Sequence, residues 1–173
     1  FWNDIPAMAA PFFTDDYPVD EKAGTRQVPF GREIWIDRAD FMEVPEKKFF
    51  RMAPGQEVRL RGACIFKCTG CVKNDAGEVV EIHGTWDPES WGGNAADGRK
   101  VKGTIHWVDC ATGVKAEVRL YGNLFADEDP DGAGKDYIDC LNPESLLVRH
   151  GCKLEKMLGE ATAPAQYQFL RLG

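Results

Sequence analysis

The chain has 173 residues, of which 43% are hydrophobic and 28% charged, and its formal net charge is −7. This composition predicts a folded protein and excludes a disordered one, because a chain of this size buries a sizeable core. No run approaches the roughly 18 apolar residues that a membrane helix needs, and the opening residues lack the basic start and apolar centre of a signal peptide. We therefore expect no membrane association. Because the chain starts without Met, we also expect a piece of a longer protein.

The first long strand is predicted from alternating residues in the first half of the chain. Residues 1–25 contain several prolines and are expected to be a linker or a part of a second β unit. Residues 57–72 alternate between apolar and polar positions, which predicts a single long strand. Its two expected faces are Leu60, Cys64, Phe66 and Cys68 on the apolar side, and Arg59, Arg61, Ile65 and Lys67 on the other.

A hairpin and two further strands follow in chain order. Residues 73–77 offer turn chemistry, and residues 78–86 return as the second strand of a hairpin. After a loop rich in Gly, Asn and Asp, strands are predicted over 100–108 and 116–120. The inward positions expected in these elements are Val80, Ile82, Trp86, Val101, Gly103, Ile105, Trp107, Ala116, Val118 and Leu120.

The composition changes after residue 126. Residues 127–134 are acidic and predict a connection, residues 142–148 a turn leading into a strand, residues 153–158 a short helix, and residues 166–172 a last strand. The fold class is therefore mainly β. Because closure removes exposed strand edges, we expect two antiparallel β-barrels, the second incomplete in this chain. The expected units are an amino-terminal segment, a first barrel and a partial second barrel, over residues 1–25, 26–122 and 123–173.

The charges are unevenly placed along this acidic chain. Residues 46–73 carry seven basic residues against two acidic ones, whereas residues 127–139 carry six acidic residues against one lysine. A local basic face on an acidic body is compatible with selective RNA binding. The alternative is that these charges are the solvated faces of ordinary strands.

Residues able to perform catalysis or hold a metal are sparse. The chain has three histidines and two serines, and neither serine lies in a nucleophile elbow. Cys68 and Cys71 form a Cys-x-x-Cys pair with Cys64 nearby, which keeps a zinc site open, but no second close pair exists. We expect no metal and no cofactor. The six cysteines are interpreted as free thiols in a reducing compartment, which predicts a cytoplasmic location.

The arginines of the basic segment are the best candidates for function. Arg59 and Arg61 are two residues apart, so a strand directs both guanidinium groups to one side. Each offers a planar fork that can pair with a phosphate or a base edge and can stack on a base. Phe49 and Phe50 add aromatic surface next to Arg51. Splayed single-stranded bases are recognised by groups of these kinds.

Three long segments carry a resemblance to a known family. They are Gly24-Thr-Arg-Gln-Val-Pro-Phe30, residues 33–41 (Glu-Ile-Trp-Ile-Asp-Arg-Ala-Asp-Phe) and residues 97–108 (Asp-Gly-Arg-Lys-Val-Lys-Gly-Thr-Ile-His-Trp-Val). With these segments, the chain closely resembles the C-terminal anticodon-binding region of bacterial glutaminyl-tRNA synthetases. The resemblance runs from about residue 24 to residue 171 and implies two β-barrels that read the anticodon of glutamine tRNA.

The resemblance also implies roles for individual residues. It places Arg59 and Arg61 at the first anticodon base and its phosphate, and Arg51 at the third base. Gln168 and Arg171 correspond to residues that line the pocket for the central uridine. Two positions depart from the family pattern: Lys48 stands where a glutamine faces the central base, and Phe50 stands where the family has a lysine. The candidate RNA-binding residues are Lys48, Arg51, Arg59, Arg61, Gln168 and Arg171.

The resemblance further implies the partners and the limits of this chain. The partners are glutamine tRNA and the enzyme's own catalytic domain, which uses ATP and lies outside this sequence; the chain alone is expected to be inactive and monomeric. The alternatives are the related region of a glutamyl-tRNA synthetase, a ribosomal-type RNA-binding barrel, and an extracellular carbohydrate-binding module. Base-specific binding to an anticodon loop separates the first interpretation from the ribosomal one.

Overall fold

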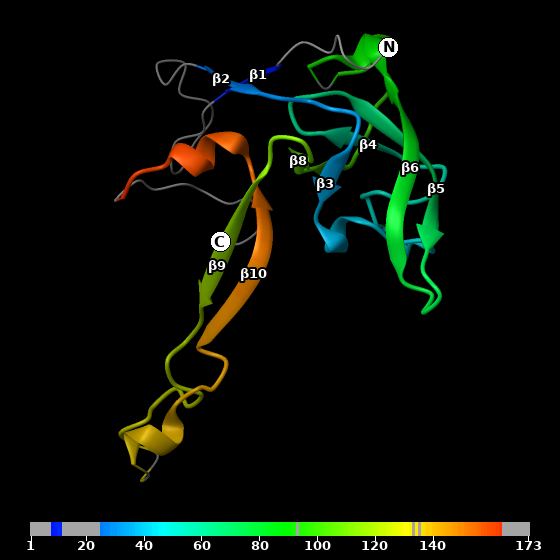
Figure 1. Ribbon diagram of the computed structural model, residues 1–173. Coiled ribbons are helices and arrows are strands. Elements are labelled where there is room, and N and C mark those ends of the chain that lie inside the picture. Colours follow the sequence, from blue (N-terminus) through cyan, green and yellow to red (C-terminus); the bar gives the residue numbers. More distant parts are fainter. Residues whose placement is uncertain (1–7, 12–24, 93, 133, 135, 164–173) are drawn as a thin grey trace.

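The computed structural model describes residues 8–11, 25–92, 94–132, 134 and 136–163 (Figure 1). Its strands are β1 (Met8–Pro11), β2 (Thr25–Val28), β3 (Ile34–Ile36), β4 (Glu57–Leu60), β5 (Ile65–Lys73), β6 (Val79–Asp87), β7 (Thr104–Ile105), β8 (Trp107–Asp109), β9 (Val114–Tyr121) and β10 (Leu146–Leu154). The short 3-10 helices are η2 (Arg38–Asp40), η3 (Pro88–Ser90), η4 (Tyr137–Cys140) and η5 (Lys156–Glu160). The prediction of a mainly β protein is confirmed. Within the described ranges, no helix is both long and apolar enough to cross a membrane.

The strands form one four-stranded sheet and three two-stranded sheets. The larger sheet has the order β6-β5-β4-β7, in which β4 and β7 are parallel and the other neighbours antiparallel. The pairs are β1 with β2, β3 with β8, and β9 with β10. After Ile105 the chain leaves the larger sheet, and Trp107–Asp109 pairs with β3 instead. The described sheets are therefore open, and the expected closure into barrels is not confirmed.

The prediction of one long strand over residues 57–72 is wrong. This segment forms two antiparallel strands, β4 and β5, joined by a tight turn. The turn is closed by hydrogen bonds from Leu60 N to Cys64 O at 2.9 Å and from Ala63 N to Leu60 O at 2.9 Å. Gly62 has φ of 67°, which glycine adopts at little cost, and it reverses the chain. The turn also places Ile65 in the core, at 1% exposure, instead of beside the arginines.

The hairpin predicted to follow is confirmed as β5 and β6, and of its three predicted inward residues only Val80 is wrong. Val80, expected to point inward, is 62% exposed, and Val79 packs on the core with Ile82 and Trp86. The pairing shifts between Val72 and Lys73, where an irregularity breaks the alternation of the ladder.

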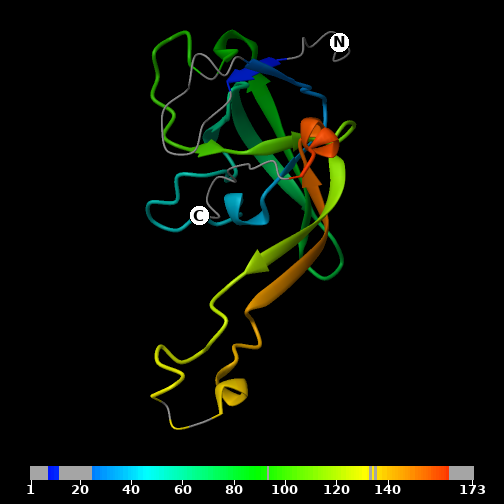
Figure 2. The ribbon, with the colours of Figure 1, turned by 90° about the vertical axis from the view of Figure 1, so that its left-hand side faces the viewer.

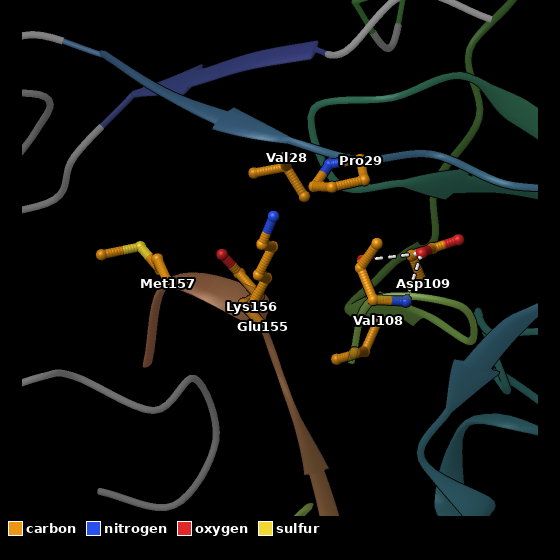
Figure 3. A pocket seen from close by; sticks show the side chains of 8 residues that line it. Val28, Pro29, Val108, Asp109, Glu155, Lys156 and Met157 are labelled. Atoms are coloured by element: carbon orange, nitrogen blue, oxygen red, sulfur yellow. Dashed lines mark hydrogen bonds between the residues drawn. The ribbon is translucent and has the colours of Figure 1, made fainter. Parts of the chain in front are cut away.

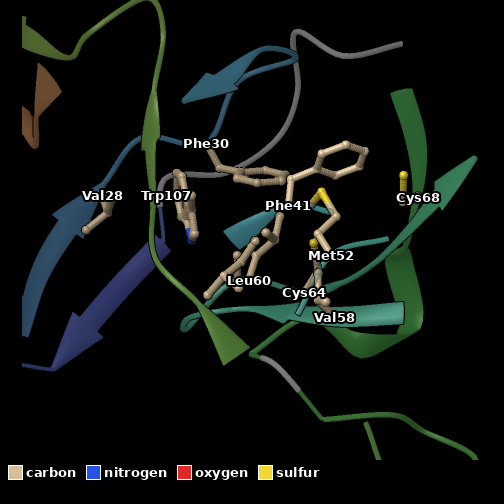
Figure 4. Packing of buried hydrophobic residues seen from close by; sticks show 11 residues of the cluster. Val28, Phe30, Phe41, Met52, Val58, Leu60, Cys64, Cys68 and Trp107 are labelled. Carbon is tan, nitrogen blue, oxygen red and sulfur yellow. The ribbon is translucent and has the colours of Figure 1, made fainter. Parts of the chain in front are cut away.

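In the core, side chains of the larger sheet pack with Trp107 of β8 and with Phe30, Phe41 and Met52 (Figure 4). Gly103, Ile105 and Trp107 are buried as predicted, although the strand expected over 100–108 is present only as β7 and β8. The Trp107 ring meets Phe30 edge to face with centroids 5.0 Å apart, and its Nε1 donates to the Arg61 carbonyl at 3.1 Å. Trp107 therefore joins the core to the turn that carries Arg61.

The β9–β10 pair forms a ribbon that extends away from this body (Figure 2). Positions 116, 118 and 120 share the half-buried face of β9, as the alternation predicted. The acidic connection lies at the far end of the ribbon (Figure 1). The pairing of β9 with β10 crosses the expected domain boundary at residues 122–123.

The carboxyl-terminal elements correct one more expectation. The helix predicted over 153–158 is wrong in its first part, because β10 continues to Leu154 and η5 occupies Lys156–Glu160. Pairing of Lys153 and Leu154 with the start of β9 holds them extended. The strand predicted over 166–172 lies outside the described residues, as does most of the expected 1–25 segment.

Candidate functional site

Arg59 and Arg61 lie at the edge where β4 meets β7. Their backbone N–H groups donate to the carbonyls of Gly103 at 2.8 Å and Ile105 at 3.0 Å. The hydrogen bonds between β4 and β7 thus continue past the end of β4 to Arg61. Side chains therefore still alternate between the two faces of the sheet up to Arg61. Leu60 between them is fully buried, while both arginines are half-buried. The two arginines therefore belong to the same, solvent-facing side of this edge.

Arg51 is held by the loop that precedes it. Its Nη1 lies 3.1 Å from Asp40 Oδ1 and donates to the Ala39 carbonyl at 3.1 Å. The Asp40 side chain is fully buried and the Arg51 side chain is 36% exposed. Met52 N also donates to the Asp40 carbonyl at 2.9 Å, so backbone and side chain fix the two segments together. One end of the Arg51 guanidinium therefore points toward the buried Asp40 carboxylate, while the rest of this side chain stays accessible to a ligand.

Lys48 has an unusual backbone. Its φ is 71°, and Lys48 is the one residue other than glycine with a positive φ among those described. It sits in a turn closed by a hydrogen bond from Phe49 N to the Glu46 carbonyl at 3.1 Å. A left-handed conformation costs a residue with a side chain about 1 kcal/mol, and such conformations cluster at functional sites.

An open groove of about 550 Å³ lies beside these residues, and we call it the basic groove. It is lined by Glu46, Lys48, Phe49, Phe50, Gly55, Gln56, Glu57, Lys67, Lys100, Val101, Lys102 and Gly103. Lys67, Lys100 and Lys102 are not among the candidate residues predicted from the sequence. Lys100 and Lys102 are two positions apart in a segment where lysines alternate with small or apolar residues. This spacing predicts that both lysines lie on the same face of an extended chain.

Arg99 organises the acidic neighbours of the basic groove. Its guanidinium lies 2.6 Å from Asp87 Oδ2, 3.0 Å from Glu57 Oε2 and 2.8 Å from Asp97 Oδ2. The hydrogen bonds to Asp87, Glu57 and Asp97, in that order, raise the pKa of Arg99. The hydrogen bonds from the Arg99 backbone and side chain lower the pKa of Asp97. Glu57 is the groove carboxylate among them, and Arg99 compensates its charge.

A second hollow is too small for a ligand (Figure 3). It has about 10 Å³, room for about one water molecule, and lies where η5 faces β2 and β8. There Asp109 accepts hydrogen bonds from Thr112 N at 2.9 Å and Thr112 Oγ1 at 2.7 Å. These contacts close the turn after β8.

Gln168 and Arg171 lie outside the described residues, so the structure does not place them beside the other four. Cys64, Cys68 and Cys71 are free thiols. Across the described ranges, no group of three or more His, Cys, Asp or Glu side chains is arranged to hold a metal ion. Burial, with a smaller contribution from Asp87, raises the pKa of Cys64 to about 12, which keeps it a neutral thiol.

Comparison with known proteins covers most of the chain. Two family models described as "tRNA synthetases class I (E and Q), anti-codon binding domain" match residues 9–87 and 104–173. Similar curated proteins include the glutamine–tRNA ligases of Nitrobacter winogradskyi, Psychromonas ingrahamii and Clostridioides difficile, which are 52%, 50% and 47% identical over 158, 157 and 154 residues. These alignments cover 91%, 91% and 89% of this chain. The chain spans 28% of the length of each relative.

Proposed function

Because this chain belongs to the anticodon-binding domain family of class I tRNA synthetases for glutamate and glutamine, we propose that it binds the anticodon loop of glutamine tRNA. The observation that carries this proposal is that Arg51, Arg59 and Arg61 are all half-buried and stand at positions that neighbouring segments fix. The β7 ladder holds Arg59 and Arg61, and Asp40 holds Arg51. The contact with Asp40 preorganises the Arg51 guanidinium, which therefore loses little freedom on binding, and this favours selective contacts with a base or phosphate.

We propose that these residues divide the recognition among the anticodon bases. Arg59 and Arg61 contact the first base and its phosphate, and Arg51 contacts the third base. Lys48 contributes a positive charge near the central base, supported by its place in the basic groove. Gln168 and Arg171 complete the central pocket in this proposal.

In a whole glutamine–tRNA ligase, this recognition would select the tRNA for glutaminylation by a catalytic domain that uses ATP. The curated relatives, which carry that name, support this role. We propose no cofactor or metal for this chain, and a monomeric protein. We also propose a cytoplasmic location, which the six free cysteines support. We also propose a first barrel over residues 26–122 and a partial second barrel over 123–173, joined by the β9–β10 ribbon.

The test is equilibrium binding of this chain to glutamine tRNA, to versions with each anticodon base replaced, and to glutamate tRNA. Replacement of a base read by an arginine should weaken binding by roughly 1–3 kcal/mol. Arg59→Ala should abolish discrimination at the first base, whereas Arg119→Ala, a control on the exposed side of β9, should preserve it. Equal binding to all of these RNAs would refute anticodon reading. A preference for glutamate tRNA would assign the chain to the glutamate branch of the family.

A further inference from the structure

The basic groove carries more positive charge than the candidate arginines alone suggest. Four lysines line it, at positions 48, 67, 100 and 102, against two glutamates. Glu57 is engaged by Arg99 at 3.0 Å, so its charge is compensated from outside the groove. Within the described part of the chain, none of the four lysines forms a salt bridge. Such a concentration of cations attracts an anionic ligand.

The aromatic wall of the groove adds a second kind of contact. Phe50 is 51% exposed and lines the groove, so its ring is accessible to a ligand there. Lys102 Nζ lies 4.9 Å from the centroid of this ring. Because Lys102 lies over one face of the ring, a base would stack on the other face while its phosphate contacts the ammonium groups of the groove.

The groove is continuous with the residues proposed to read the anticodon. Gly103, which lines it, packs so closely on Phe50 that an added Cβ would overlap the Phe50 carbonyl. The carbonyl of Gly103 accepts from Arg59 N at 2.8 Å, and Phe50 directly precedes Arg51. The Gly103 segment therefore lies between the Arg51 loop and β4. An RNA strand that contacts both arginines passes beside the groove.

We propose that the basic groove binds one nucleotide of the tRNA strand that flanks the anticodon, without reading its base. Phe50 stacks on the base, and Lys67, Lys100 and Lys102 contact the phosphates. The volume of about 550 Å³ lies within the range of roughly 300–1,000 Å³ typical of ligand pockets. Because stacking accepts every base, this contact adds affinity without specificity. The inference rests on the proposed tRNA binding and extends it to Phe50, Lys67, Lys100 and Lys102, to which the resemblance assigns no contact.

The experiment measures affinity for glutamine tRNA at several salt concentrations. Lys67→Ala and Lys102→Ala should each reduce the slope of log affinity against log salt by about 0.7, the value for one phosphate contact on a single strand. Phe50→Ala should weaken binding about tenfold with little change in slope. Phe50→Tyr should keep the affinity and Phe50→Leu should lose it, because a ring and not apolar bulk is required. Lys115→Ala, an exposed lysine of β9, is the matched control.

The outcomes separate this inference from the proposed function. If Phe50→Ala binds like the parent and the lysine variants keep its salt slope, the groove proposal is overturned, even where Arg59→Ala still loses base discrimination. If the parent does not discriminate between anticodons, the proposed function fails whatever the groove variants do. If Phe50→Ala loses the same affinity for tRNAs that differ in the flanking base, and the lysine variants show the reduced salt slopes, the groove is established as a subsite that does not read the base. Circular dichroism of each variant checks that it remains folded.

Discussion

Replacing either member of the Asp40–Arg51 pair should reveal how the Arg51 guanidinium is held. The Asp40 carboxylate is fully buried and lies 3.1 Å from Arg51 Nη1, while the Arg51 side chain is 36% exposed. Arg51→Ala leaves a buried carboxylate without this cation. Asp40→Asn leaves a cation that can turn toward water. The two substitutions remove the same contact, but we expect them to have unequal costs.

The magnitude follows from the burial of the two partners. Breaking a fully buried pair costs about 3–5 kcal/mol, and breaking an exposed pair costs about 0–1 kcal/mol. Because one partner reaches solvent, Arg51→Ala should lower the free energy of unfolding by about 2 kcal/mol. Asp40→Asn should cost about 1 kcal/mol, since it leaves no buried charge unpaired. The double variant should lose less than the sum of the single variants, with a coupling of at least about 0.5 kcal/mol.

Urea denaturation of the parent, both single variants and the double variant measures this coupling. The same Asp40→Asn variant should bind glutamine tRNA about 0.5–1.5 kcal/mol more weakly, because Arg51 must then be ordered on binding. Arg38→Ala in the same loop controls for general loosening of η2. Additive stabilities, or a larger cost for Asp40→Asn than for Arg51→Ala, would refute the conclusion that a buried carboxylate anchors this arginine.

Three further substitutions test the scaffold of the site. Gly103→Ala should destabilise the chain by about 2–3 kcal/mol in thermal denaturation, since its Cβ overlaps the Phe50 backbone; an unchanged melting temperature would contradict this close approach. Burial raises the pKa of the Cys64 thiol from 9.0 to about 12. The buried neutral thiol therefore contributes fully to the free energy of unfolding below pH 9. This contribution is lost at about 1.4 kcal/mol per pH unit as the pH rises toward 12. Cys64→Ala should remove this part of the alkaline slope, and identical slopes would refute the assignment. Lys48→Gly should relieve the positive φ and raise stability by up to about 1 kcal/mol while weakening tRNA binding; a loss of both would show that the lysine side chain supports the fold.

Local alternation predicted the faces of strands wherever the ladder is regular. Positions 116, 118 and 120 share the half-buried face of the continuous strand β9 as expected, because the pleat alone fixes a period of two. The prediction was wrong where the backbone departs from that period. Gly62 reverses the chain inside an alternating segment, and the shift next to Lys73 moves Val79 inward in place of Val80. A glycine inside a strand pattern is the one local sign of such a departure.

The candidate site was predictable only where its residues are neighbours in sequence. Arg59 and Arg61 both donate their backbone N–H groups to the β7 segment, so they lie on the same side of the chain, as their spacing indicated. Lys67 and Lys102 line the same groove although 35 positions separate them, because β4 pairs with β5 on one side and with β7 on the other. No local pattern specifies the parallel β4–β7 pairing. The contact of Arg51 with Asp40 depends likewise on a loop conformation that alternation does not describe.

The net charge of −7 does not oppose RNA binding, because the acidic excess is set apart from the basic groove. The acidic connection lies at the far end of the β9–β10 ribbon, away from the larger sheet (Figure 1). The eight residues of β9 alone extend about 26 Å, several times the Debye length of about 8 Å at physiological salt. Neutralising two acids of this connection, with Glu128→Gln and Asp131→Asn, should therefore leave tRNA affinity unchanged near 0.15 M salt. It should strengthen binding only near 0.01 M, where the Debye length reaches about 30 Å. A gain at physiological salt would mean that the acidic connection lies close to the bound RNA.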